Sequence, residues 1–408
     1  MSGPTLPDIN KVYWIDPKRI QMHTNYHING CPKDFADRVF GPKDKGKVKS
    51  GNWDISEYRF EDLDIVQAIK QRIINKIPWE ETEFYSKMLY KIKKGSSIEM
   101  PWGCNTKKDL DKRCAYIDKL IESIEKNGFK ENHEIYLCKE SFNLLKTPYM
   151  SEEVSVNIGR DGQYLFQDGR HRLAIAKFLG IKKIPVKVHI RHQKWVQLRS
   201  FLINMAEKEA GASKSGFLYQ PALHPDLLDI PAHNDCHSRF KQIVANLSSN
   251  NGRLLDLGSN LGYFCHKFEE LGFDCIAIEY LPDISMVADK IRIAEGKNFK
   301  ILTGDFTAMV NEPPLKDDSF QVVLALNIFH HFLKSEETYN KLISFLNILK
   351  VNEMYFEAHN PDEPQMKESY INYTDVEFVD FILSNSALNY AKRLACCNGG
   401  RVLYKLTI

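Results

Sequence analysis

The stretch Arg253–Phe264, RLLDLGSNLGYF, joins a short run of apolar residues to a turn that contains two glycines. The apolar run has the length of a buried strand, and the residues after the turn resume a helical pattern. Gly258 and Gly262 frame the turn. A glycine-containing turn between a strand and a helix is a frequent ligand-binding feature of α/β proteins, so this turn is the first candidate for a functional site.

Around this turn, from about residue 236 onward, strand-like and helix-like segments alternate. Strands that alternate with helices of this length indicate a parallel sheet covered on both faces, which is a doubly wound, Rossmann-like α/β fold. The predicted strands are 253–258, 274–280, 299–305, 320–327 and 353–359, with a final strand at 399–408 that we expect to be antiparallel. The predicted helices are 238–249, 263–272, 283–296 and 335–349.

The chain of 408 residues is long enough for two domains. The pattern changes between about residues 195 and 235, where Gly, Ser and Pro become frequent. We therefore predict an N-terminal α+β domain at 1–200, a linker or entry segment at 201–235 and the α/β domain at 236–408. In the front half we expect helices at 61–75 and 109–128, strands at 153–159, 163–169 and 183–190, and a helix at 171–180.

The composition excludes several kinds of partner. Lys and Arg (55) nearly balance Asp and Glu (53), which gives no electrostatic signal for a nucleic acid or a membrane surface. No run approaches the ~18 apolar residues of a membrane helix, and the N-terminus lacks the pattern of a signal peptide. The nine cysteines form no CxxC pair, so we expect free thiols, a cytoplasmic location and no metal site.

The turn itself favours one kind of nucleoside cofactor. Gly258 permits a left-handed backbone conformation, and Asn260 tolerates that conformation better than most residues. Glu279 ends the second predicted strand, where a carboxylate can accept hydrogen bonds from ribose hydroxyls. A dinucleotide would favour the GxGxxG pattern, but the third glycine position holds Tyr263. S-adenosylmethionine carries no phosphate and needs only the close approach and the ribose carboxylate.

Residues 236–408 resemble the class I S-adenosylmethionine-dependent methyltransferases. LLDLGSNLGYF is similar to the family's first motif with Asn in place of its middle glycine, and AIEY is similar to the acidic end of its second strand. TGDF and VVLALNIFHHFL are similar to the motifs that follow its third and fourth strands. Four matches in order, at the ends of four successive strands, make this resemblance specific.

The resemblance implies a role for each matched residue. Asp256 would anchor the turn, Glu279 would bind the ribose hydroxyls, and Asn327 would lie on the methionine side. Asp305 and Phe306 would bind the adenine. The residues that would line the methionine and ribose portions are Gly258, Ser259, Asn260 and Gly262.

Candidates for a general base lie after the fourth and fifth strands. Methyl transfer is an in-line displacement that depends mostly on positioning the acceptor, and a hydroxyl acceptor also benefits from a base. The candidates are His330, His331, Glu357 and His359. Adjacent helical residues point about 100° apart, so at most one of the two neighbouring histidines should face the cofactor. An acceptor that is already ionised, such as a carboxylate or phosphate, would need no base.

The front half contains one further dense motif, QDGRHR. Asp168 and Gly169 form a turn after a predicted strand, and Arg170, His171 and Arg172 begin the next helix. Two guanidinium groups beside a helix N-terminus can bind a phosphate, although ion-paired arginines in a surface turn are the alternative.

This second motif, within residues 151–190, resembles the fold shared by the ParB N-terminal domain and sulfiredoxin, which includes nucleotide-dependent serine kinases. In that fold a DGxHR-like turn contacts nucleotide phosphates, which implies ATP or another nucleotide as a ligand here. The reactive cysteine of sulfiredoxin has no counterpart beside the turn, so redox repair is not expected.

The sequence thus predicts a methyltransferase that acts on a small-molecule or glycan hydroxyl or phosphate. Its N-terminal domain would bind a phosphorylated ligand or act as a kinase ahead of the methyl transfer. A catalytically silent module that senses S-adenosylmethionine is the alternative. A nucleic-acid methyltransferase is a third reading, which the charge balance disfavours, as does NIFH at 327–330 in place of an Asn/Asp-Pro-Pro-Tyr/Phe motif. No feature of the sequence indicates an oligomeric state.

Overall fold

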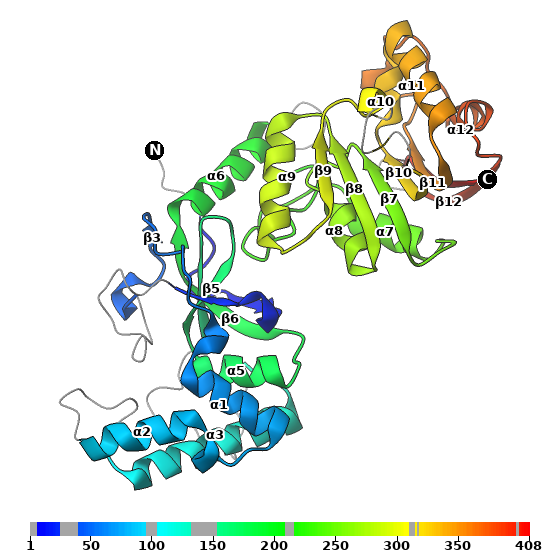
Figure 1. Ribbon diagram of the computed structural model, residues 1–408. Helices are drawn as coiled ribbons and strands as arrows, with labels where there is room; N and C mark the ends of the chain where they lie inside the picture. Colours follow the sequence, from blue (N-terminus) through cyan, green and yellow to red (C-terminus); the bar gives the residue numbers. More distant parts are fainter. Residues whose placement is uncertain are drawn as a thin grey trace. The chain divides into compact units, whose positions relative to one another are not determined.

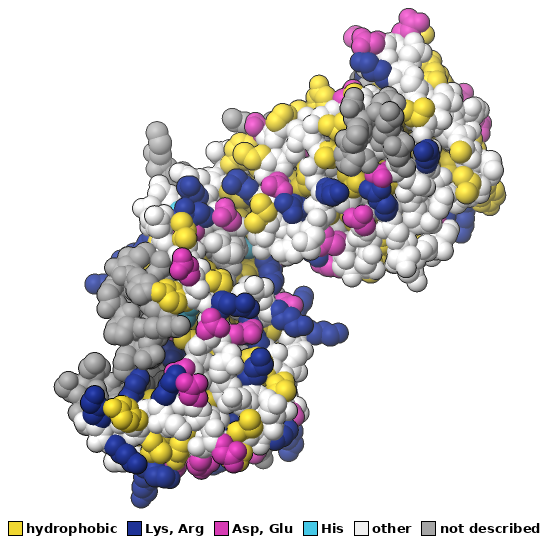
Figure 2. Space-filling model, viewed as in Figure 1, with side chains coloured by type: hydrophobic (Ala, Val, Ile, Leu, Met, Phe, Trp, Pro, Cys, Tyr) yellow, Lys and Arg dark blue, Asp and Glu magenta, His cyan; other side chains and the backbone are white. Residues whose placement is uncertain are grey.

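In the computed structural model the chain forms two units, residues 1–200 and 201–408 (Figure 1). No helix within the described stretches is long and apolar enough to cross a membrane. On the face seen in Figure 2, positive and negative side chains are interspersed over both units. The described residues are 6–24, 40–94, 104–131, 153–208, 216–309, 315, 318–396 and 400–408.

The second unit contains a seven-stranded sheet in the order β12-β13-β11-β10-β7-β8-β9. Strands β7 to β11 are parallel, whereas β13 is antiparallel to both β11 and β12. The doubly wound sheet and its antiparallel final strand are therefore confirmed, while the edge strand β12 was not predicted. The strands are β7 (Gly252–Leu257), β8 (Phe273–Glu279), β9 (Lys300–Thr303), β10 (Phe320–Leu326), β11 (Val351–Ala358), β12 (Tyr390–Cys396) and β13 (Val402–Thr407).

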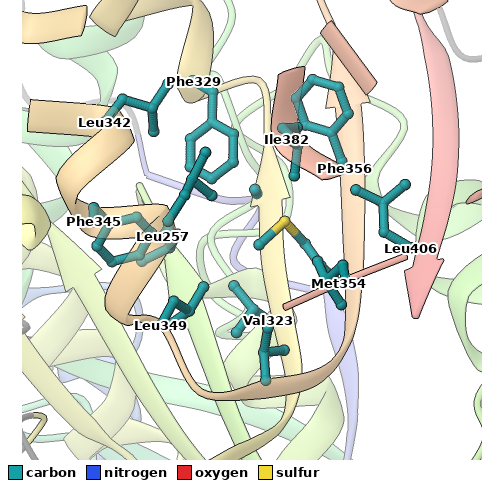
Figure 3. Packing of buried hydrophobic residues seen from close by; sticks show 14 of the residues in the cluster. Leu257, Val323, Phe329, Leu342, Phe345, Leu349, Met354, Phe356, Ile382 and Leu406 are labelled. Carbon is teal, nitrogen blue, oxygen red and sulfur yellow. The ribbon is translucent and has the colours of Figure 1, made fainter. Parts of the chain in front are cut away.

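Helices cover both faces of this sheet, as its uninterrupted apolar strands require. Leu254 packs with residues of α7 and α8 on one face, whereas Leu255 packs with residues of α11 and α12 on the other. Figure 3 shows the second of these cores, in which Phe345 and Leu349 lie beside Val323. The helices are α7 (Cys236–Val244), α8 (Tyr263–Glu270), α9 (Pro282–Ala294), α10 (Phe306–Met309), α11 (Glu336–Ile348) and α12 (Asp375–Ser384), with a 3-10 helix η10 (Phe329–Leu333).

The first unit contains a mixed sheet in the order β1-β6-β4-β5-β2, with β3 also paired to β6. In Figure 1 helices α1, α2 and α3 lie together beyond α5. The strands are β1 (Val12–Ile15), β2 (Met22–His23), β3 (Val48–Lys49), β4 (Val154–Ile158), β5 (Tyr164–Asp168) and β6 (Ile184–His192). The helices are α1 (Asp64–Lys70), α2 (Glu83–Lys94), α3 (Lys107–Asn127), α5 (Arg170–Phe178) and α6 (Gln193–Lys208), and a π-helical turn (Gln71–Asn75) follows α1.

The sequence signals predicted some elements of this unit and missed others. Helix α3 ends as expected, because Gly128 takes a φ of 73° at its C-cap, and Thr106 and Asp109 form a capping box at its start. Helices α2 and α6 and the strands β1 to β3 were not predicted. The strands span only two to four residues, and segments of this length carry little periodicity. The ParB- and sulfiredoxin-like identity of this unit stays a prediction.

Candidate functional site

The candidate site begins where the strand order of the large sheet reverses. Strands β8 and β9 follow β7 on one side, whereas β10 and β11 lie on its other side. Connections from β7 and β10 therefore leave the carboxyl edge in opposite directions and open a crevice there, which is the usual ligand position in such sheets. The turn at Gly258 follows β7, and Asn327 follows β10, so both lie at this reversal.

The glycine turn adopts the backbone conformations expected from its sequence. The φ angles of Gly258, Asn260 and Gly262 are 68°, 49° and 77°, which places all three in the left-handed region. The Asn is thus confirmed as a substitute for glycine in this conformation. The backbone N–H groups of Gly258 and Ser259 both donate to the carbonyl of Ile278 at 2.9 Å, so β8 holds the start of the turn.

Gly258 also lies too close to its surroundings to carry a side chain. A Cβ atom at this position would lie 2.7 Å from Cδ1 of Ile328, the residue that follows Asn327. Two independent constraints, the positive φ and the close approach, therefore require glycine here.

Glu279 ties the end of β8 to the glycine turn. One carboxylate oxygen, Oε2, accepts a hydrogen bond from the backbone N–H of Asn260 at 2.8 Å, and Oε1 accepts one from Leu281 N–H at 2.9 Å. The side chain is buried, which raises its pKa, although the hydrogen bonds from the backbone oppose that effect. A carboxylate acceptor therefore lies at the turn, as the sequence predicts.

Asp256 lies beneath the turn and is fully enclosed. Burial and the neighbouring Glu279 carboxylate raise its pKa to about 7. Its one hydrogen-bond partner among the described residues is the thiol of Cys265, at a distance of 3.9 Å from Sγ to Oδ2. The hydrogen bonds that hold the turn come from β8 and Glu279, so the anchoring role expected of Asp256 stays a prediction.

Asp305 and Phe306, which were expected beside the adenine, differ in their surroundings. The Asp305 carboxylate accepts hydrogen bonds from the backbone N–H and the hydroxyl of Thr307 at 2.9 and 2.7 Å, which caps the short helix α10. The Phe306 ring is buried, with its centroid 4.9 Å from Phe332 and 4.8 Å from Phe345. Phe306 is thus part of the core, and Asp305 is the more accessible of the two.

Two polar pairs occupy the ends of β10 and β11. The Asn327 side-chain amide donates to the hydroxyl of Tyr219 at 3.2 Å. The Glu357 carboxylate is buried and forms an ion pair with Arg239, with 3.2 Å between Oε2 and Nε. Burial raises the pKa of Glu357, and the Arg239 guanidinium acts in the opposite direction.

The three candidate histidines lie together. The ring centroids of His330 and His331 are 4.1 Å apart, and those of His330 and His359 are 5.9 Å apart. His330 and His359 are buried, and burial lowers the pKa of His330 to about 2, so this imidazole is neutral. His359 Nε2–H donates to Asn372 Oδ1 at 3.0 Å, whereas its buried Nδ1 has no hydrogen-bond partner among the described residues.

Sequence reasoning missed the residues that support these candidates. Tyr219 lies in the segment interpreted as a linker or entry loop, where its position gave no signal. Arg239 had a usable signal, because it lies on the buried stripe of α7 between Cys236 and Ile243, and an arginine in an apolar stripe indicates a buried partner. Arg401 is a third residue that sequence reasoning missed. Its guanidinium donates two hydrogen bonds, of 2.7 and 2.6 Å, to the Glu363 carboxylate.

The QDGRHR motif of the first unit forms the predicted turn and helix start. The Asp168 carboxylate accepts from Gly169 N–H at 2.8 Å, and Gly169 has a φ of 90° as the N-cap of α5. His171 Nδ1 lies 3.3 Å from Nη2 of Arg113, which comes from α3.

Both arginines of this motif are buried, contrary to what a surface turn would give. Burial lowers the pKa of Arg170 to about 10, and Arg172 lies 3.6 Å from the Glu153 carboxylate. A third guanidinium, that of Arg113, adds to these two, so positive charge is concentrated at the start of α5.

The described part of the chain contains no group of three or more His, Cys, Asp or Glu side chains that could hold a metal ion. Within the same stretches, five cysteines are buried free thiols, namely Cys104, Cys114, Cys236, Cys265 and Cys275.

Comparison with known proteins gives the class of the second unit. Residues 255–352 match a family model described as a methyltransferase domain. Together with the doubly wound sheet, this match defines the unit as a methyltransferase domain. The sheet that carries this match has the doubly wound, Rossmann-like strand order.

Several solved structures, two of them of methyltransferases, resemble part of the chain. The bifunctional kinase-methyltransferase WbdD matches at 16% identity over 47% of this chain and 44% of its own, with a TM-score of 0.39. PH0226 from Pyrococcus horikoshii OT3 matches at 15% identity over 42% and 90%, with a TM-score of 0.32. The magnesium protoporphyrin IX methyltransferase ChlM from Synechocystis PCC 6803 matches at 11% identity over 42% and 76%, also at 0.32. The matched region spans less than half of WbdD, and no curated protein sequence matches the chain.

Proposed function

We propose that the second unit transfers a methyl group from S-adenosylmethionine to a small-molecule or glycan acceptor, at a hydroxyl or a phosphate oxygen. The observation that carries this proposal is the glycine turn after β7, which Glu279 ties to the end of β8 through Asn260. The backbone of the glycine turn and the buried carboxylate of Glu279 therefore lie side by side at the point where the strand order of the sheet reverses.

In this proposal each candidate contacts one part of the cofactor. Gly258, Ser259, Asn260 and Gly262 would lie against the methionine and ribose portions, and Asp256 would support them from below. Glu279 would accept hydrogen bonds from the ribose hydroxyls, and Asp305 would lie nearest the adenine, with Phe306 packed behind it. Asn327 would lie on the methionine side, held by Tyr219.

Catalysis by this domain rests on positioning the acceptor oxygen in line with the sulfonium methyl group, a contribution of roughly 7–11 kcal/mol. The oxygen attacks the methyl carbon, the carbon–sulfur bond breaks, and its electron pair stays on sulfur. A hydroxyl acceptor also loses a proton, for which the neutral imidazoles of His330, His331 and His359 are candidates. Glu357 is engaged with Arg239, which favours a role in holding the site.

Titration calorimetry with S-adenosylhomocysteine tests the cofactor assignment. We expect saturable heat with one site per chain, and transfer of a radiolabelled methyl group from S-adenosylmethionine to an acceptor in a panel of phosphorylated and hydroxylated sugars and polyols. An absence of heat would refute the cofactor site. Heat without transfer to any acceptor would favour the alternative of a silent sensor over the enzyme. A cytoplasmic location stays a prediction.

We further infer that the first unit binds a phosphorylated ligand at the start of α5, with ATP as the leading candidate and kinase activity as its consequence. The concentration of Arg113, Arg170 and Arg172 at a helix N-terminus supports this inference, because guanidinium groups bind phosphate oxygens in pairs.

Calorimetry with ATP tests this second proposal. Wild-type protein is expected to bind ATP, and the double variant Arg170→Ala, Arg172→Ala is expected to bind it at least about tenfold more weakly, since each charge-assisted hydrogen bond contributes about 1.5–3 kcal/mol. Arg292→Ala is the matched control, because that arginine pairs with Asp289 within helix α9 of the other unit. Equal ATP affinity in the wild type and the double variant would refute the assignment.

A further inference from the structure

A cationic cluster lies on the half of the sheet edge that the proposed cofactor residues leave open. Apart from Asn327, those residues lie at or after the ends of β7, β8 and β9, whereas His330 follows β10 and His359 follows β11. Arg401 immediately precedes β13, which runs antiparallel to β11 with Val402 opposite Ala358, so it lies at the same edge. Lys334 follows η10 directly.

The charges in this cluster do not balance. Arg401 is neutralised by Glu363, and Arg239 is neutralised by Glu357. Lys334 has no carboxylate within ion-pair distance among the described residues, and its nearest polar partner is the thioether of Met366 at 3.6 Å. One uncompensated ammonium group therefore remains beside the imidazoles of His330, His331 and His359.

The cations and the imidazoles act on each other. Burial lowers the pKa of both His330 and His359, and the charges of Arg401 and Lys334 lower it further, whereas Asn372 and Glu363 raise the pKa of His359. The buried Nδ1 of His359 has no hydrogen-bond partner among the described residues. A buried polar atom is ordinarily hydrogen-bonded. Because Nε2–H donates to Asn372, Nδ1 is an acceptor in the neutral ring and becomes a donor toward an anion only when the ring takes up a proton.

We propose that this cluster, consisting of Lys334, Arg401, His330, His331 and His359, binds an anionic group of the methyl acceptor, either a carboxylate or a phosphate. This proposal rests on the proposed function and narrows its acceptor. An anionic oxygen would balance the ammonium of Lys334 and accept hydrogen bonds from the imidazoles once they are protonated or in the donor tautomer.

Lys334 is partly exposed, and the imidazoles of the cluster are neutral in the free protein. Burial, and to a lesser extent the nearby cations, oppose protonation of the imidazoles in the free protein. An arriving anion reverses this electrostatic balance and permits the imidazoles to take up a proton.

Nuclear magnetic resonance of the histidine rings tests the proposal with simple anions as probes. Full-length protein labelled in histidine is titrated with sodium phosphate and, separately, with sodium acetate at constant ionic strength, with and without S-adenosylhomocysteine. We expect the ring signals of His330 and His359 to shift with saturation for at least one anion. Preference for phosphate or acetate then distinguishes a phosphorylated acceptor from a carboxylic one.

Variants decide whether the cluster is the binding site. Lys334→Gln is expected to weaken the anion about tenfold or more, the loss that one charge-assisted hydrogen bond predicts, and Arg401→Gln is expected to weaken it as well. Lys267→Gln is the matched control, because that lysine pairs with Glu270 at the far end of α8. Unchanged heat of S-adenosylhomocysteine binding in each variant shows that the domain is folded.

Two results would overturn the proposal. One is the absence of a histidine shift with either anion in wild-type protein that binds S-adenosylhomocysteine. The other is anion affinity that Lys334→Gln and Arg401→Gln leave unchanged. A protein that binds an anion at this cluster but shows no heat with S-adenosylhomocysteine would refute the methyltransferase cofactor site instead, so the two failures can be told apart.

Discussion

Glu279→Ala is expected to weaken the binding of S-adenosylmethionine by at least about a hundredfold. The carboxylate is buried and holds the N–H groups of Asn260 and Leu281, and the proposed ribose hydroxyls would donate to the same oxygens. Two charge-assisted hydrogen bonds at about 1.5–3 kcal/mol each account for a loss of this size. Titration calorimetry of the variant with S-adenosylhomocysteine measures the change in Kd directly.

Glu269→Ala is the matched control for this substitution. The Glu269 carboxylate also accepts two backbone hydrogen bonds, from Asn298 N–H at 2.9 Å and Phe299 N–H at 2.7 Å, but it lies on α8 away from the proposed site. We expect it to lower thermal stability without changing the affinity for S-adenosylhomocysteine. If both variants bind S-adenosylhomocysteine as tightly as the wild type does, the ribose assignment of Glu279 is wrong.

The second large effect is expected from Gly258→Ala. The substitution places a Cβ atom at a φ of 68° and 2.7 Å from Cδ1 of Ile328. Left-handed strain contributes about 1–2 kcal/mol and the overpacked contact about 1–3 kcal/mol, so the free energy of unfolding should fall by roughly 2–5 kcal/mol. Because Ile328 directly follows Asn327, the shift that relieves the contact should also reduce cofactor affinity by more than about tenfold.

Gly296→Ala separates the two causes of that effect. Gly296 has a φ of 64°, close to that of Gly258, but a Cβ atom there would have nothing within 4 Å. Urea unfolding should therefore show only the left-handed strain in Gly296→Ala, about 1–2 kcal/mol, with cofactor affinity unchanged. Equal losses of stability in the two variants would show that the contact with Ile328 is relieved without cost.

The elements with strong local signals were predicted well. Strands β7, β8, β10 and β11 are short apolar runs that end in polar or glycine residues, and the model places them within a few residues of the predicted ranges. The turn at Gly258 and Asn260 could be interpreted because left-handed backbone has a narrow residue preference. Strand β12 was missed, since Tyr390–Cys396 mixes charged and apolar residues at an edge, where burial imposes less pattern.

The supporting side chains of the site could not be predicted in the same way. Arg239 and Glu357 are 118 positions apart in the sequence and Asn327 and Tyr219 are 108 apart, so no local pattern links either pair. The excess positive charge at Lys334 could not be predicted from the sequence either, because only the folded structure shows that Glu363 neutralises Arg401. The position of Phe306 in the core could not be predicted from the sequence either, because it depends on ring contacts with Phe332 and Phe345.

The residue pattern alone was sufficient for the parallel sheet of residues 236–408, the left-handed turn after its first strand and the acidic residue at the end of its second. These features depend on hydrophobic periodicity and backbone preference, which act between residues close together in the chain. The partners of Glu357, Asn327 and the histidines emerged only from the folded structure. Ion pairs and ring contacts depend on distances in space, and the return of β13 beside β11 determines which charges meet at the edge of the sheet.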